Sequence, residues 1–158
     1  MANNFQVFGK NAVLTLEPVI SRANTNTLNI EIAPLSNGKS IHSSKIIAQP
    51  TSKEIPLLTA LFLGFLPAYR IQRADKWMTF LRQKEKGVVY IKSGGNGRVL
   101  GLPISAGDAY VVSNKILEAL LLGSINQGNL VEVNIRSCAK LYMKESMKIL
   151  QENTNNER

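Results

Sequence analysis

Apolar and polar residues alternate along the first third of the chain, which is the pattern of strands with one buried face. From Phe5 to Glu17, the alternation places Ala12, Leu14 and Leu16 together on one face. Pro18 follows and is expected to end or bend this first strand, because proline has no N–H to donate to a neighbouring strand.

Two more strands are expected before residue 50. The segment "TLNIEIAP" alternates cleanly and turns Leu28, Ile30 and Ile32 inward. The turn-rich loop "SNGKSIHSS" then leads to a short strand at residues 45–49. The first third of the chain is therefore predicted to form a β-sheet.

The hydrophobic period changes to that of a helix after residue 50. Thr51, followed three residues later by Glu54, forms a capping box directly before the apolar run "IPLLTALFLG". Gly64 is a suitable residue for the position after the last turn. This helix is apolar nearly all round, so we expect the domain or another subunit to bury it.

The second half repeats this plan. Four strand-like segments are expected at residues 68–73, 77–83, 87–92 and 98–104. A looser capping box of Ser105 and Asp108 then opens a helix that is expected to stop at Gly123.

A third helical stretch is expected at residues 134–151, followed by a polar tip, "ENTNNER", that is expected to fray. The predicted fold class is α+β. It has two antiparallel four-stranded β-sheets with helices packed between or behind them, in the order ββββα-ββββα, and an additional C-terminal helix. We divide the chain into a domain at residues 1–123 and a helical extension at residues 124–158.

The charge of the chain is strongly basic and unevenly placed. The 158 residues carry a formal charge of +8, with a pI near 9.8. Residues 68–99 contain eight Lys and Arg against two acids, a local charge of +6. A solvated face would intersperse more acids, so this segment favours a polyanionic partner such as a nucleic acid.

Several classes of protein and site are disfavoured. Cys138 is the only cysteine, which excludes an intramolecular disulfide and favours a reducing compartment. The N-terminus "MANNFQVFGK" lacks the features of a signal peptide, and the longest apolar run is too short to span a bilayer. We therefore expect a soluble, intracellular protein, cytoplasmic or nucleoid-associated, with no membrane partner.

No catalytic or cofactor motif is complete. The stretch "NGKS" resembles the end of a P-loop, but Ala33 stands where that motif needs glycine, and no helix follows. His42 is the only histidine, and no Cys/His spacing suits a metal. We find no nucleophile with a base, and expect a protein that is not an enzyme and needs no cofactor or metal.

Aromatic residues interleave with the cations of the basic segment. Tyr69, Trp77, Phe80 and Tyr90 each lie within two residues of a Lys or Arg. A β-surface of this kind can stack rings on unpaired bases while its cations neutralise phosphates. The alternative is that these rings belong to the core, and strand alternation alone does not decide between the two because a one-residue slip inverts the faces.

Two stretches resemble a known family. The segments "GKNAVLTLEP", "LNIEIAP" and "SKIIAQPTSKEIPLLTALFLG" are similar to the first half of the Whirly single-stranded-DNA-binding proteins. Gly9, Lys10, Ala12 and Val13 match the later positions of the Lys-Gly-Lys-Ala-Ala-Leu signature of that family, while Phe8 replaces its leading lysine. Asn11 stands in place of one alanine of that signature.

The second half, "RVLGLPISAGDAYVVSNKILEALL", is similar to the closing strand and last helix of the same family. The resemblance covers residues 5–122, and the third helical stretch has no counterpart. It implies a homotetramer with its helices at the centre and single-stranded DNA bound along the sheets, largely without sequence preference. It also implies a role in DNA replication, recombination or repair. Lys10 would act in DNA-induced assembly of tetramers, and Gly9 would permit a bend or bulge.

We therefore predict a surface that binds single-stranded DNA through the strands of residues 68–98 and the first strand. Bases are expected to stack on some of Phe8, Tyr69, Trp77, Phe80 and Tyr90. Phosphates are expected to be met by Lys10, Lys45, Arg70, Arg73, Arg82, Lys92 and Arg98. Two alternatives stay open: an RNA-binding or RNA-annealing module on the same fold, as in related mitochondrial RNA-binding proteins, and a protein-interaction scaffold subunit.

Overall fold

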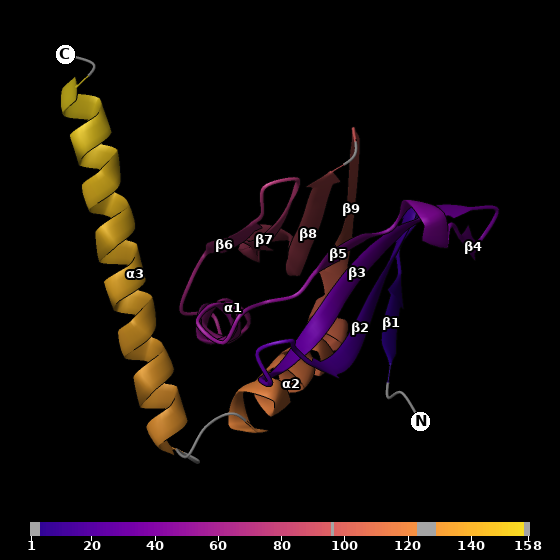
Figure 1. The fold of residues 1–158 in the computed structure, drawn as a ribbon. Coiled ribbons are helices and arrows are strands. Elements are labelled where there is room, and N and C mark those ends of the chain that lie inside the picture. Colours follow the sequence, from indigo (N-terminus) through magenta and orange to yellow (C-terminus); the bar gives the residue numbers. More distant parts are fainter. Residues whose placement is uncertain (1–3, 96, 123–128, 157–158) are drawn as a thin grey trace.

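The computed structural model describes residues 4–95, 97–122 and 129–156, with the side chains of the last helix described over residues 132–146. It contains two antiparallel sheets and three α-helices, which confirms the predicted α+β class (Figure 1). The order of elements also shows the predicted repetition, a set of strands and then a helix in each half.

The N-terminal sheet has five strands, one more than expected. Its strands follow the order β1-β2-β3-β4, and β5 pairs with another part of β3. The bounds are β1 (Phe5–Phe8), β2 (Ala12–Ile20), β3 (Asn26–Ser36), β4 (Lys39–Ser40) and β5 (Ile46–Ala48).

The opening segment is a hairpin and not one strand, which corrects the prediction from the sequence. Phe8 pairs with Val13, and the amide of Gly9 donates to the carbonyl of Ala12 at 2.8 Å across the turn between them. A Cβ on Gly9 would lie 2.9 Å from the Cβ of Leu102. Glycine is therefore needed here because the turn packs closely against the other sheet.

The position of Pro18 also differs from expectation, because β2 continues through it to Ile20. The pairing of β1 with β2 ends at Leu16, whereas Pro18 pairs with Leu28 of β3. Among the residues that the structure describes, β2 beyond Leu16 has a neighbour on one side only, and proline is tolerated on such an edge.

Helix α1 (Glu54–Phe62) begins and ends as predicted. The amide of Thr51 donates to Glu54 Oε1 at 3.0 Å, and the amide of Glu54 donates to Thr51 Oγ1 at 3.3 Å, the two bonds of a capping box. After the helix, Gly64 has a φ of 89°, and the amide of Phe65 donates to the carbonyl of Ala60 at 2.8 Å. These contacts form a Schellman motif.

The C-terminal sheet has the order β6-β7-β8-β9 and matches the prediction closely. Its strands are β6 (Ala68–Gln72), β7 (Lys76–Gln83), β8 (Val88–Gly95) and β9 (Arg98–Ser105). Helix α2 (Ala106–Leu122) follows, and the amide of Asp108 donates to Ser105 Oγ at 3.3 Å as the capping box requires. Gly123 and the boundary between residues 123 and 124 lie outside the described residues.

Helix α3 (Asn129–Asn156) is longer than predicted at both ends. It begins five residues before the expected start and remains helical through most of the tip that was expected to fray. Ile135 and Ala139 are buried, and the ring of Tyr142 meets that of Tyr69 edge-on at 5.7 Å. The second half of the helix extends away from the rest of the molecule (Figure 1).

The core lies between the two sheets and α1. The inward rows of both sheets meet there, and α1 contacts β6, α2 and α3. Leu58, Ala60 and Leu61 of α1 are fully buried. The chain itself therefore covers most of the helix whose apolar surface raised the expectation of a second subunit. None of the helices in the described residues is both long and apolar enough to cross a membrane.

Candidate nucleic-acid interface

The pairing of the strands shows which residues of the C-terminal sheet face away from the core. Thr79 pairs with Arg70 on one side and Lys92 on the other, and Lys92 pairs with Gly101. The residues of this row and of the rows two positions away face outward. We call the outward-facing residues of these four strands the outer face: Ala68, Arg70, Gln72, Trp77, Thr79, Leu81, Gln83, Val88, Tyr90, Lys92, Gly94, Val99, Gly101, Pro103 and Ser105.

Two aromatic rings on the outer face lie across glycines of the next strand. A Cβ on Gly94 would lie 2.4–2.5 Å from three atoms of the Trp77 indole. A Cβ on Gly101 would lie 2.7 Å from the Tyr90 hydroxyl oxygen and 3.1 Å from two ring carbons. Real Cβ atoms essentially never lie within 3.0 Å of another heavy atom of this kind. Each ring can therefore lie against the backbone of the sheet only because the residue beneath it is glycine.

The charged residues of the outer face are both cations. The guanidinium carbon of Arg70 lies over the Trp77 ring, 4.8 Å from its centroid, a cation–π contact. Lys92 is exposed and lies on the same face as both rings. None of the outward positions of these four strands carries an acid, so the face combines rings with unopposed positive charge.

Tyr69 and Phe80 do not contribute to this face, which corrects their prediction as stacking residues. They pair with each other on the inward side, with exposed fractions of only 7% and 1%. Phe80 meets Phe62 of α1 edge-on, with ring centroids 6.2 Å apart. Burial raises the pKa of the Tyr69 hydroxyl well above its usual range. Both rings belong to the core and cannot meet a base.

Arg73 is also a structural residue and not a free phosphate ligand. Its guanidinium donates to both carboxylate oxygens of Glu54, at 2.6 and 3.1 Å, and to the carbonyl of Gln49 at 2.9 Å. The hydrogen bond to Glu54 raises the pKa of Arg73, although burial opposes this. The residue fastens the β6–β7 turn to the start of α1.

Arg82 caps the C-terminal end of α1. Its Nη1 donates to the carbonyls of Leu61 and Phe62, at 3.0 and 3.2 Å. The Leu61 carbonyl also accepts from the amide of Gly64 at 3.0 Å. A positive charge at this end of a helix is favoured by the helix dipole. Arg82 therefore does not belong to the outer face, and its contact with a phosphate stays a prediction.

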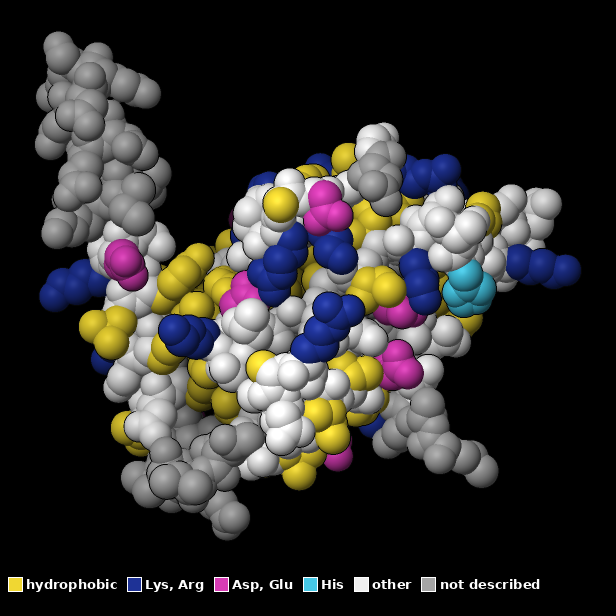
Figure 2. Space-filling model, in the orientation of Figure 1, with side chains coloured by type: hydrophobic (Ala, Val, Ile, Leu, Met, Phe, Trp, Pro, Cys, Tyr) yellow, Lys and Arg dark blue, Asp and Glu magenta, His cyan; other side chains and the backbone are white. Residues whose placement is uncertain are grey.

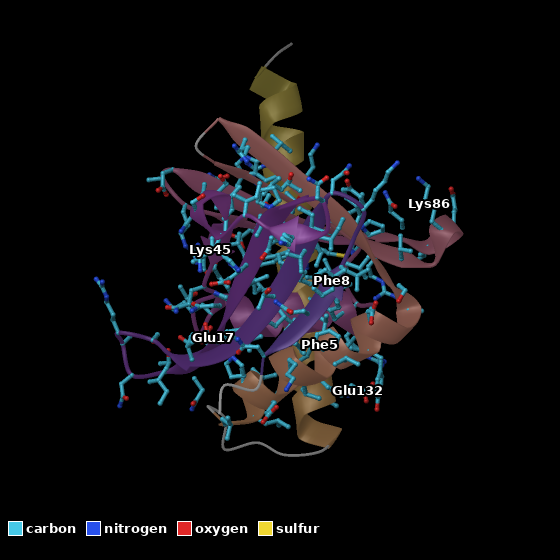
Figure 3. The ribbon with its side chains drawn as sticks, turned by 90° about the vertical axis from the view of Figure 1, so that its right-hand side faces the viewer. Phe5, Phe8, Glu17, Lys45, Lys86 and Glu132 are labelled. Atoms are coloured by element: carbon cyan, nitrogen blue, oxygen red, sulfur yellow. The ribbon has the colours of Figure 1, made fainter. Side chains whose placement is uncertain are left out.

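The remaining predicted residues lie apart from the outer face. Phe8 is 63% exposed and Lys10 lies in the exposed β1–β2 turn. Lys45 forms an ion pair with Glu31 at 3.1 Å, and Figure 3 shows it well separated from Phe8. Arg98 is exposed at the start of β9, but its pairing with Gly95 places it in an inward row.

Lys and Arg side chains also gather on a second surface. Figure 2 shows them across the middle of the face in view, over β5, β7 and β8, with Asp and Glu side chains among them. The Lys45–Glu31 and Arg73–Glu54 pairs account for part of such mixed charge. The outer face differs because none of its outward positions carries an acid.

Sequence reasoning did not identify Gly94 and Gly101 as part of the site. A glycine inside a strand weakens it unless something packs closely there, and an aromatic ring on the neighbouring strand is a recognised compensation. Glycines inside two predicted strands, each beside a strand that carries an aromatic residue, were the sequence signal that could have identified Gly94 and Gly101. No group of three or more His, Cys, Asp or Glu residues that could hold a metal occurs within the described ranges.

No family model and no curated protein matches this sequence. Among solved structures, the fold is similar to a crystal structure of MRP1/MRP2 from Trypanosoma brucei, with a TM-score of 0.55 and 9% sequence identity. The match covers 76% of this chain and 92% of that chain. At this identity the likeness concerns the fold alone.

Proposed function

We propose that this protein binds single-stranded DNA through the outer face of its C-terminal sheet, as a Whirly-like protein acting in DNA replication, recombination or repair. The observation that carries the proposal is the pair of rings, Trp77 and Tyr90, resting on strand glycines beside the unopposed cations Arg70 and Lys92. Rings held in this way stack on bases, and the cations meet phosphates.

Stacking on protein rings favours single strands over duplex, because the bases of a duplex already stack on one another. Each base that stacks on an aromatic side chain contributes about 1–3 kcal/mol. A duplex would also have to open before its bases could reach the sheet. The outer face therefore suits an unpaired strand.

The polar groups of the outer face favour binding without sequence preference. The Gln72 amide already accepts from Arg70 Nε at 2.8 Å and donates to the carbonyl of Arg73 at 2.7 Å. The hydroxyl of Thr79 donates to the carbonyl of Lys92 at 3.4 Å. With Gln72 and Thr79 engaged in this way, we expect stacking and charge to supply most of the affinity, and both tolerate any base.

Trp77 is the only tryptophan of the chain, so its fluorescence tests the proposal directly. We expect a single strand of about 30 nucleotides to quench this fluorescence and to bind with an affinity that falls as salt rises. Matched duplex should fail to displace it. Preference for the matched RNA would instead support the RNA-binding alternative, because only RNA offers a 2′-hydroxyl. Absence of any binding at low salt would support a scaffold role.

We also propose a homotetramer, as the resemblance implies. The helices expose large apolar side chains that a second copy could cover, including Tyr110, Leu122 and Leu141, which are 68%, 66% and 70% exposed. Sedimentation velocity with and without DNA tests this: a tetrameric species supports it, and a monomer under both conditions contradicts it.

A further inference from the structure

The two rings of the outer face have a defined spacing. Gly101 pairs directly with Lys92, and Gly94 follows Lys92 by two residues on β8. Neighbouring strands lie about 4.8 Å apart and alternate residues of one strand about 7 Å apart, so the two glycines are about 8 Å from each other. The Trp77 ring lies over Gly94, and the Tyr90 ring reaches Gly101.

That spacing is too wide for two bases that stay stacked on each other. Stacked bases in a duplex are about 3.4 Å apart along the strand, less than half the distance between the two glycines. A strand whose bases occupy both rings must therefore be extended. An extended nucleotide spans more than the stacked rise, which fits consecutive bases better than bases separated by further nucleotides.

Lys92 lies between the two rings. It follows Tyr90 by two residues on β8, precedes Gly94 by two, and is paired with Gly101. Lys92 shares an outward row with Gly101, which supports Tyr90. The neighbouring outward row contains Gly94, which supports Trp77. The ammonium group of Lys92 is thus placed to meet a phosphate that joins two nucleotides held on the rings.

We propose that the outer face contains a dinucleotide site. Trp77 and Tyr90 stack on two consecutive bases of an extended strand, and Lys92 meets the phosphate that links them. Arg70 lies over the Trp77 ring from β6 in the free protein, so a base that stacks on this ring displaces the guanidinium, which then meets the phosphate on the far side of that base. The strand therefore crosses the sheet from β6 toward β9. This inference rests on the proposed function.

The test uses oligonucleotides of abasic units that carry only two thymines, either adjacent or separated by three abasic units. Wild-type protein is expected to prefer the adjacent pair by about five- to a hundredfold, because only that pair fills both rings. Trp77→Leu and Tyr90→Leu should each remove the preference. Ile20→Ala, which changes an exposed apolar side chain at the end of β2, should retain it.

A second measurement addresses Lys92. Replacing the phosphate between the adjacent thymines by an uncharged methylphosphonate should weaken binding to the wild type and leave binding to Lys92→Gln unchanged. Equal affinity for adjacent and separated thymines would overturn the dinucleotide site. If the complete strand of about 30 nucleotides still quenches Trp77 in that case, the proposed function stands. If the complete strand does not bind, both proposals fail.

Discussion

The guanidinium of Arg73 donates a hydrogen bond to each carboxylate oxygen of Glu54, from Nη2 to Oε1 at 2.6 Å and from Nη1 to Oε2 at 3.1 Å. Glu54 also accepts the backbone amide of Thr51 at 3.0 Å, in the capping box of α1. One carboxylate therefore joins the start of a helix to the turn between β6 and β7.

We expect Arg73→Ala to lower the free energy of unfolding by about 1–3 kcal/mol, the range for losing hydrogen bonds to a charged group. Urea unfolding at neutral pH measures the loss. The affinity of the folded protein for single-stranded DNA should stay within twofold of the wild type. Arg22→Ala, which removes an exposed cation from the β2–β3 turn, is the matched control and should change neither quantity. A large loss of affinity for single-stranded DNA without a loss of unfolding free energy would show that Arg73 binds DNA.

The same pair predicts a dependence of stability on acid. Burial raises the pKa of Glu54, but the hydrogen bonds from Arg73 and Thr51 and the charge of Arg73 lower it by more, so its pKa in the folded protein lies below the ordinary value of 4.5. The stabilisation is therefore present above that ordinary value and is lost as the pH falls through the folded pKa. Glu54→Gln should flatten the acid limb of a stability profile measured between neutral pH and acid. An unchanged acid limb would assign the acid sensitivity to other carboxylates.

Arg82 gives a prediction about helix capping. Arg82→Met keeps much of the side-chain volume but removes the guanidinium that donates to the carbonyls of Leu61 and Phe62, of which Leu61 retains the amide of Gly64 as a donor. We expect a loss of about 1–2 kcal/mol in the free energy of unfolding, with DNA affinity unchanged. Lys84→Met removes an exposed cation two residues away and should have little effect on stability. Equal losses in the two variants would mean that general charge, and not the cap, is responsible.

The sequence predicted the ends of elements better than the faces of strands. The ends of α1 are set by local interactions: the hydrogen bonds between Thr51 and Glu54, and the positive φ that Gly64 favours. Because these interactions do not depend on tertiary contacts, the sequence alone predicts them. The hairpin at the N-terminus was missed, although the inward residues change from odd to even positions between Val7 and Ala12. That change of parity is the signature of a turn within an otherwise regular alternation.

The faces of the C-terminal strands depend on tertiary contacts that no local pattern records. Tyr69 and Trp77 both lie near cations in the sequence, yet one packs against Tyr142 of α3 and the other lies on the outer face. Arg73 and Arg82 are similar: each satisfies a group of α1, an element that precedes them by about 20 residues. The composition of residues 68–99 shows that this segment is basic and aromatic. Which of its rings and cations are buried and which are exposed depends on how α1 and α3 pack against the sheet.

Gly94 tests whether the position of the Trp77 ring matters for binding. Its backbone lies in a strand, so alanine is allowed there, but the added Cβ would meet the indole and must displace it. We expect Gly94→Ala to remain folded and to lose about five- to a hundredfold in affinity for single-stranded DNA. Gly107→Ala is the control, because its Cβ would meet nothing within 4 Å. Circular dichroism verifies the fold, and an affinity equal to that of the control would show that the ring does not contact DNA.

The two cations of the outer face predict a change in the salt dependence of binding. For single strands, the logarithm of affinity falls with the logarithm of salt concentration by about 0.7 for each phosphate contacted. Arg70→Gln and Lys92→Gln should therefore each reduce that slope by about 0.7, whereas Lys39→Gln, an exposed cation on β4 of the other sheet, should not. Arg70→Lys keeps the charge and changes the geometry. It should keep the slope and lose affinity, because an ammonium does not offer a phosphate the two parallel hydrogen bonds of a planar guanidinium. A slope unaltered in both glutamine variants would place the phosphates on another surface, and Lys45, which pairs with Glu31 beside β5, would then be the first residue to mutate.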